Sequence, residues 1–172
     1  MSSLQQMQIA FSPEHDRLLL RIKSSDNSEF RLWLTRRFVA MAWPSLVGLL
    51  VSNPAVTSQP SREAQQAVLE FEHENAVSQA NFDQPYEEKV EALPLGKEPM
   101  LVSQMSIQRS KDDKHTVVFK PAKGQGINLN MGNDLIHSFC KLLSDAVDKT
   151  DWNLELQIVN QTRAEAQGAT LQ

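Results

Sequence analysis

Residues 29–50 read EFRLWLTRRFVAMAWPSLVGLL, and this stretch decides the fold. Every second residue from Phe30 to Leu34 is apolar, which is the period of a half-buried β-strand. From Phe38 to Leu50 the apolar residues recur at helical spacing, so an amphipathic helix follows directly. Thr35 stands between the two patterns and is a residue type that caps helix N-termini. The stretch therefore predicts a strand that runs into a helix beginning near Arg36.

The chain before this junction predicts two further strands. Apolar and polar residues alternate through residues 7–11 and again through residues 17–23, and the polar run 12–16 separates them as a turn. Pro44, inside the helical stretch, is expected to kink the helix or to separate its first turn. Residues 5–52 are therefore expected to form a unit of three strands and a helix.

The same pattern returns 97 residues further along the chain. Twelve apolar positions of the first unit stay apolar after this shift, and Trp43 becomes Cys140, so both are expected to be buried. The positions in the second copy are Val117, Phe119, Ile127, Leu129, Met131, Leu135, Ile136, Phe139, Cys140, Leu143, Ala146 and Val147. Residues 100–159 therefore predict a second unit of the same kind. Alternating residues from Trp152 to Ile158 predict one more strand after it.

The connector, residues 53–99, carries much of the acidic charge. Its part from residue 62 to 99 has nine acidic and three basic residues, whereas the whole chain has a net charge of −4. A helix from about residue 60 to residue 80 is expected there, with an apolar stripe of Ala64, Ala67, Val68 and Phe71.

Together these patterns predict an α+β fold. Two βββα pseudo-repeats form antiparallel sheet with helices packed on it, and the connector supplies a central inserted helix. The 172 residues suit one domain, numbered 1–172, that ends in a polar tail at residues 160–172.

The composition is that of an ordinary globular protein, with 41% hydrophobic and 22% charged residues. The longest apolar run, residues 38–51, is shorter than the roughly 20 residues that a membrane-spanning helix needs. No signal peptide is apparent at the start of the chain. The single cysteine, Cys140, fits a reducing compartment. We therefore expect a soluble cytoplasmic protein without a membrane partner.

One face of the first unit has the composition of a nucleic-acid-binding surface. Its outward positions combine cations with an aromatic ring: Arg17, Arg21, Lys23, Arg31 and Trp33. Bases can stack on an indole while cations meet phosphates, so single-stranded nucleic acid is one expected ligand. The alternative is that Trp33 and Leu19 pack under the central helix or form a homo-oligomer contact. Because the acidic segment 62–99 would repel nucleic acid, this function requires that segment to lie on the opposite side.

A resemblance points the same way. Gly126-Ile127-Asn128-Leu129-Asn130-Met131 runs directly into the helical residues Asn133-Asp134-Leu135-Ile136-His137-Ser138-Phe139. This junction and the repeated units resemble the Pur-alpha and whirly repeats. The resemblance implies single-stranded nucleic acid binding and self-association, and it covers about 45 residues of each unit.

No residue pattern predicts catalysis, a metal or a cofactor. Glu70, His73 and Glu74 share one helix face, but a second Glu-x-x-His pair of the kind found in di-iron bundles is missing, so we expect a solvated acidic face. Cys140 falls on a buried helix stripe and is expected in the core. The predicted function is a non-catalytic binding module, for single-stranded nucleic acid or, alternatively, as a protein–protein adaptor or structural subunit.

Overall fold

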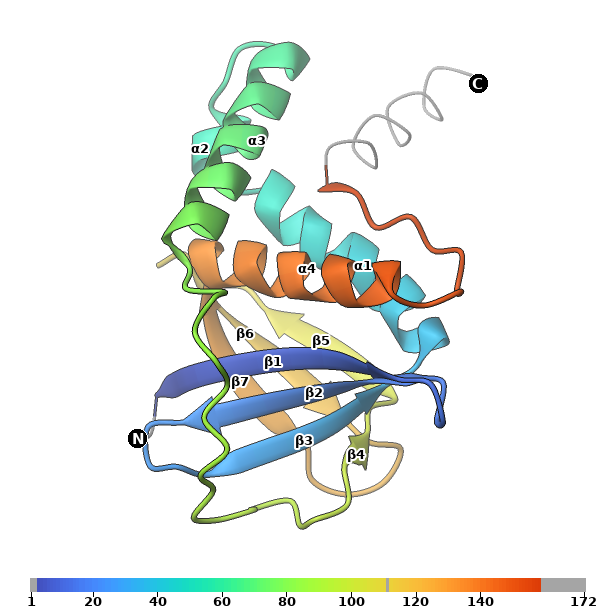
Figure 1. Cartoon of the computed structure of the whole chain (residues 1–172). Coiled ribbons are helices and arrows are strands. Elements are labelled where there is room, and N and C mark those ends of the chain that lie inside the picture. Colours follow the sequence, from blue (N-terminus) through green and yellow to red (C-terminus); the bar gives the residue numbers. More distant parts are fainter. Residues whose placement is uncertain (1–2, 111, 159–172) are drawn as a thin grey trace.

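A computed structural model describes residues 3–110 and 112–158 of the chain (Figure 1). The elements of its first half are β1 (Leu4–Ser12), β2 (Arg17–Ser24), β3 (Glu29–Leu34), α1 (Arg36–Val51), α2 (Pro54–Thr57) and α3 (Arg62–Gln79). Those of the second half are β4 (Met100–Leu101), β5 (Gln104–Gln108), β6 (Lys114–Lys120), β7 (Ile127–Gly132) and α4 (Asn133–Asp148). The mixed α+β content is as predicted.

The junction between strand and helix forms where it was expected. The Thr35 side chain accepts a hydrogen bond from the Phe38 backbone N–H at 3.1 Å, which caps α1. Pro44 lies inside α1, and the helix continues through it to Val51 without the expected separation of a first turn.

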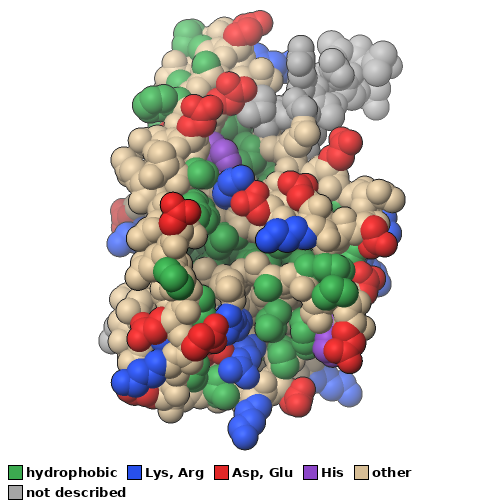
Figure 2. All heavy atoms as spheres, in the orientation of Figure 1, with side chains coloured by type: hydrophobic (Ala, Val, Ile, Leu, Met, Phe, Trp, Pro, Cys, Tyr) green, Lys and Arg blue, Asp and Glu red, His purple; other side chains and the backbone are tan. Residues whose placement is uncertain are grey.

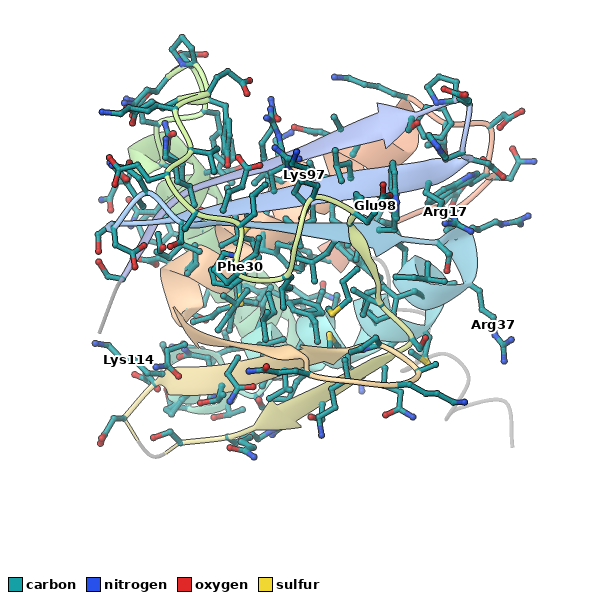
Figure 3. The ribbon with its side chains drawn as sticks, turned by 90° about the horizontal axis from the view of Figure 1, so that it is seen from below. Arg17, Phe30, Arg37, Lys97, Glu98 and Lys114 are labelled. Carbon is teal, nitrogen blue, oxygen red and sulfur yellow. The ribbon has the colours of Figure 1, made fainter. Side chains whose placement is uncertain are left out.

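The strands form two sheets. The first has the order β1-β2-β3-β4, antiparallel except for the parallel pair β3–β4, and the second is the antiparallel sheet β5-β6-β7. Figure 1 shows the sheets one behind the other, with α1 and α4 lying across the top of both. Figure 3, seen from below, shows side chains that include Phe30 filling the space between the sheets.

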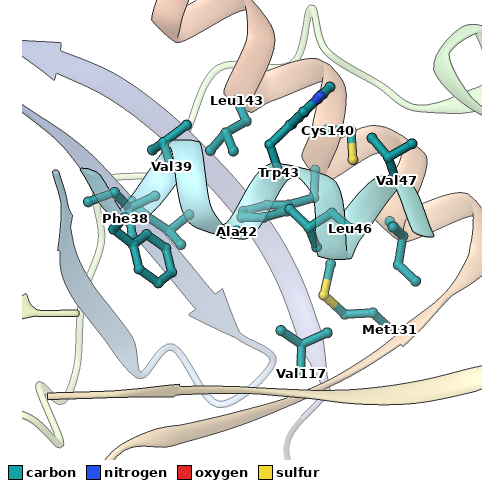
Figure 4. Close-up of a cluster of buried hydrophobic side chains, with 14 of the residues drawn as sticks. Phe38, Val39, Ala42, Trp43, Leu46, Val47, Val117, Met131, Cys140 and Leu143 are labelled. Atoms are coloured by element: carbon teal, nitrogen blue, oxygen red, sulfur yellow. The ribbon is translucent and has the colours of Figure 1, made fainter. Parts of the chain in front are cut away.

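One hydrophobic core joins both sheets to the helices. Leu32 and Leu34 of β3 are fully buried in the same cluster as the apolar face of α1. Trp43 and Cys140 are also buried, with 1% and 0% of their surfaces exposed, as their positions in the two units predicted (Figure 4).

The strand predicted from Trp152 to Ile158 is wrong. The segment is irregular, although both of these residues are buried. Trp152 packs its ring edge against Phe11 and donates a hydrogen bond from Nε1 to the Asp16 carboxylate at 2.7 Å. Alternation reports one buried face, and an extended segment can bury that face through side chains without pairing in a sheet.

The apolar stripe predicted for α3 is confirmed at Val68, which packs against the core, and is wrong at Ala67 and Phe71, which are exposed. The residues that α3 buries are Leu69 and Ala76, whereas Phe71 is 68% exposed. The helix docks on α4 partly through polar side chains: His73 meets His137, and Glu72 accepts a hydrogen bond from Asn133 at 3.4 Å. The apolar part of this face, Leu69 and Ala76, has helical spacing, whereas its polar part depends on partners in α4 that an apolar pattern does not report.

None of the helices in the described part of the chain has the length and apolar character to cross a membrane.

Candidate functional site

The structure gathers the five predicted nucleic-acid-binding residues on one sheet face. Arg17, Arg21 and Lys23 come from β2, while Arg31 and Trp33 come from β3. The antiparallel register places Arg21 opposite Arg31. Alternation along the two strands directs these side chains away from the core, so the predicted row of cations exists.

An acidic segment covers part of this face. We name residues 83–99 the strap; in Figure 1 it descends from α3, crosses β1, β2 and β3, and turns back toward β4. Lys23 is completely buried beneath it, and its Nζ donates to the Glu87 carbonyl oxygen at 3.0 Å and lies 3.5 Å from the Glu87 carboxylate. The Arg21 guanidinium donates to both carboxylate oxygens of Glu88, at 2.8 and 3.1 Å. Two of the predicted cations are therefore already paired with acids of the same chain.

Tyr86 anchors the strap between these pairs. The Arg21 guanidinium carbon lies 4.1 Å from the centre of its ring, and its hydroxyl donates to Glu29 at 2.8 Å. Glu29 is 1% exposed, and its other oxygen accepts from Arg31 Nε at 2.5 Å. Burial and the hydrogen bond to Glu29 raise the pKa of the Tyr86 phenol. The hydrogen bond to Glu88 raises the pKa of Arg21. A third predicted cation, Arg31, is thus neutralised by a carboxylate within the sheet.

The strap is also held by its backbone. The Glu29 N–H donates to the Ala92 carbonyl at 2.9 Å, and the Glu91 N–H donates to the Asn27 carbonyl at 3.0 Å. Ser28 and Ala92 form a parallel bridge, and the chain then joins the sheet as β4 beside β3. These bonds make the strap part of the folded sheet. The arrangement required for nucleic acid binding, an acidic segment on the opposite side, is not the one observed.

Arg17 and Trp33 are partly exposed, and among the described residues no hydrogen bond or ion pair joins either of them to a strap side chain. The Trp33 ring packs on the exposed His15 ring with 4.9 Å between their centres. Within the described residues, Arg17 forms no ion pair. Sequence reasoning missed the roles of Tyr86, Glu87 and Glu88. The signal was available as an acidic connector in a chain that also has a row of cations on one sheet face.

A hollow of about 480 Å³ lies between β1, α4 and residues 80–86. Five consecutive residues, from Leu4 to Gln8, line it, so it borders the edge of β1 and not one face of the strand. Within the described part of the chain that edge has no strand partner, because β1 pairs with β2 alone. The apolar wall comes mainly from α4 and from residues 82–85: Leu135, Phe139, Leu142, Phe82 and Pro85. In Figure 2 hydrophobic side chains are visible between α4 and the first sheet.

Two of the residues considered for catalysis, His73 and Cys140, line one hollow of about 320 Å³, and no hydrogen bond joins them in the described part of the chain. Burial raises the pKa of the Cys140 thiol to about 12, so it is a core group without thiolate character. Glu70 and Glu74 are exposed, as expected, but His73 is not part of a solvated face because it contacts His137. Among the described residues no group of three or more His, Cys, Asp or Glu side chains could hold a metal ion.

Comparison of the chain with protein-family models, curated proteins and solved structures finds no match.

Proposed function

We propose that this chain is a non-catalytic binding module whose ligand is an extended segment of another protein, bound in the hollow between β1 and α4. The observation that carries the proposal is an edge of β1 that has no strand partner among the described residues and borders a hollow with an apolar wall. An extended peptide can add to such an edge through its backbone while its alternate side chains enter the pocket beside it. The proposal gives a binding site to the protein–protein adaptor function that the sequence left as an alternative.

The lining indicates the chemistry of the ligand. Leu135, Phe139 and Leu142 on α4 offer apolar contacts, and the side-chain amide of Gln5 offers hydrogen bonds. The Gln8 amide oxygen already accepts from Arg21, so the Gln8 NH₂ group is the part that faces a ligand as a donor. Among the described residues of the lining, Asp83 alone is charged. A hollow of this volume takes a few side chains. The expected ligand is therefore an uncharged stretch with apolar residues at every second position.

Selection from a library of phage-displayed random peptides tests this site. We expect the wild-type chain to enrich peptides with alternating apolar residues that bind at micromolar concentration. Ser138→Trp places a large ring in the hollow from α4 and should weaken these peptides at least tenfold, about 1.4 kcal/mol.

The matched control is Ser78→Trp, which adds the same ring at an exposed position of α3. Peptides should bind this variant as they bind the wild type. If enriched peptides bind the Ser138→Trp variant undiminished, their site is elsewhere and the proposed groove is wrong.

Single-stranded nucleic acid is the second candidate, favoured by the partly exposed Arg17 and Trp33 of the cation face. We expect little binding of a labelled oligonucleotide by the wild-type chain, because Lys23 and Arg21 already form ion pairs with Glu87 and Glu88. The double variant Glu87→Gln, Glu88→Gln should bind more tightly, with a salt dependence of about −0.7 per phosphate contacted. Fluorescence anisotropy at low salt measures the affinity of the oligonucleotide for the wild-type chain and for the double variant. Tight wild-type binding that Trp33→Ala abolishes would put nucleic acid first.

We also propose that the two units, β1-β2-β3-α1 and β5-β6-β7-α4, descend from one βββα ancestor, with α3 inserted between them. The twelve apolar positions at one spacing support this origin. Relationship to the Pur-alpha and whirly repeats and residence in the cytoplasm stay predictions that rest on the sequence.

A further inference from the structure

The open edge of the second sheet carries an inference that is independent of the groove beside β1. Within the described residues β5 pairs with β6 alone, so its other edge has no strand partner. A second hollow, of about 250 Å³, borders this edge and is lined by Ser103 to Ser106, Lys120 and Met41 of α1. Met41 is 53% exposed, and Met105 and Ile107 are only partly buried.

This edge lacks the features that keep edge strands from pairing. Natural edge strands are protected by lysine, proline, inward charges or a cover. The five residues of β5, Gln-Met-Ser-Ile-Gln, include no charge and no proline. The other edge of this sheet, β7, also has no charge and no proline, but two of its three large apolar residues, Ile127 and Met131, are buried and Leu129 alone is partly buried. Both apolar residues of β5 are partly buried and the exposed Met41 lies beside them, so more uncovered apolar surface accompanies the edge of β5 than that of β7.

We propose that β5 pairs with β5 of a second copy of this chain, antiparallel about Ser106, to form a two-fold dimer with one six-stranded sheet. In this register Gln104 faces Gln108 of the other copy, and Met105 faces Ile107. Met105 already stands opposite Phe119, and Ile107 opposite Val117, on β6. The apolar row of each sheet thus continues across the two-fold axis, and Ser106, a small residue, meets itself at the centre.

The charges permit this pairing. A two-fold axis places any charge at the centre of β5 opposite itself, which is destabilising, and β5 has none. The nearest cations are Lys120, which stands opposite Gln104 on β6, and Arg109, which follows β5 and would face Ser103 of the other copy. Pairing of two copies covers the β5 edge of both copies at once, and a two-fold interface requires a strand that is complementary to itself. The sequence of β5 meets this requirement, which a strand from another protein would not impose.

Charge substitution at Ser106 tests the dimer, since its exposed side chain would meet its own copy. Sedimentation velocity should show the 19.4 kDa wild-type chain as a dimer at micromolar concentration. Ser106→Lys and Ser106→Glu should each raise the dimer dissociation constant at least tenfold, because like charges then face each other. An equimolar mixture of the two variants should sediment as a dimer again, since the facing charges are now opposite.

Asn128→Lys is the matched control, because it adds the same charge to an exposed position on the same sheet face, on β7 at the opposite edge from β5. It should stay dimeric. At concentrations well below the dimer dissociation constant all variants should keep the wild-type unfolding midpoint, since dimerisation itself raises the midpoint. A monomeric wild-type chain overturns the proposal and leaves a foreign strand as the occupant of this edge. A Ser106→Lys variant that remains dimeric, or a mixture that remains monomeric, overturns it as well.

Discussion

Trp43→Ala should lower the free energy of unfolding by about 3–5 kcal/mol, as large-to-small core substitutions do. Trp43 is 1% exposed and lies on the buried face of α1, on the side that meets α4 (Figure 4). Its indole Nε1 is buried and forms no hydrogen bond within the described residues, so the loss is one of packing. Urea unfolding followed by circular dichroism measures the change.

Met41→Ala is the control, because Met41 lies two residues earlier in the same helix and is 53% exposed. Surface substitutions usually change stability by no more than about 0.5 kcal/mol, so this variant should unfold near the wild-type midpoint. Equal midpoints for Trp43→Ala and the wild type would show that α1 does not bury the face described here. A Met41→Ala effect that appears only in the dimer would instead report the second copy beside β5.

The elements that sequence reasoning found are those whose signal is local. The strand and helix around Thr35 were predicted because alternation, a cap and helical spacing all lie within residues 29–50. The burial of Cys140 followed from its equivalence to Trp43. In each case the residues that carry the pattern are the residues that pack, so periodicity was sufficient.

The strap could not be predicted in the same way, because its partners are far away in the sequence. Glu88 meets Arg21 across 67 residues, and Tyr86 meets Glu29 across 57. Residues 83–99 have no periodicity, and their place follows from charge pairing and from two backbone hydrogen bonds, one to the first residue of β3 and one to the turn before it. The sequence correctly predicted that the cations of β2 and β3 share one sheet face. It did not show that Glu87 and Glu88 of the same chain pair with two of them. The groove beside β1 was missed for the same reason, since α4 and residues 80–86 build it together.

A pair of histidines between α3 and α4 gives the second large effect, a loss of stability in acid. Nδ1 of His73 and Nδ1 of His137 lie 2.9 Å apart, so one ring donates and the other accepts. If both rings were protonated, two N–H groups would face each other. His137 is completely buried, and burial, together with the neighbouring His73, lowers its pKa from 6.5 to about 4. Burial lowers the pKa of His73 as well.

The sign follows from which state binds more protons. Between pH 6.5 and about 4 the unfolded chain protonates His137 while the folded chain does not, so stability falls as the pH falls. Across this window the loss is about 3 kcal/mol, since one pKa unit is worth about 1.36 kcal/mol. Glu72, whose carboxylate lies 4.0 Å from His137 Nε2, acts in the opposite direction, because burial raises its pKa. Lys141 opposes protonation of His73 and Glu74 favours it.

Unfolding free energies measured at several pH values between 7.5 and 4.5 should therefore fall steeply for the wild type and less steeply for His137→Phe. Phenylalanine cannot be protonated and has a side chain of similar volume. The variant therefore removes the effect of protonation on stability while largely preserving the packing. An NMR titration in which the His137 ring stays neutral at pH 5 would agree with the slope. Parallel pH profiles for the two proteins would mean that the acid loss arises elsewhere. Because α3 docks on α4 through this pair, we expect the amides of α3 to lose exchange protection in acid before those of α1.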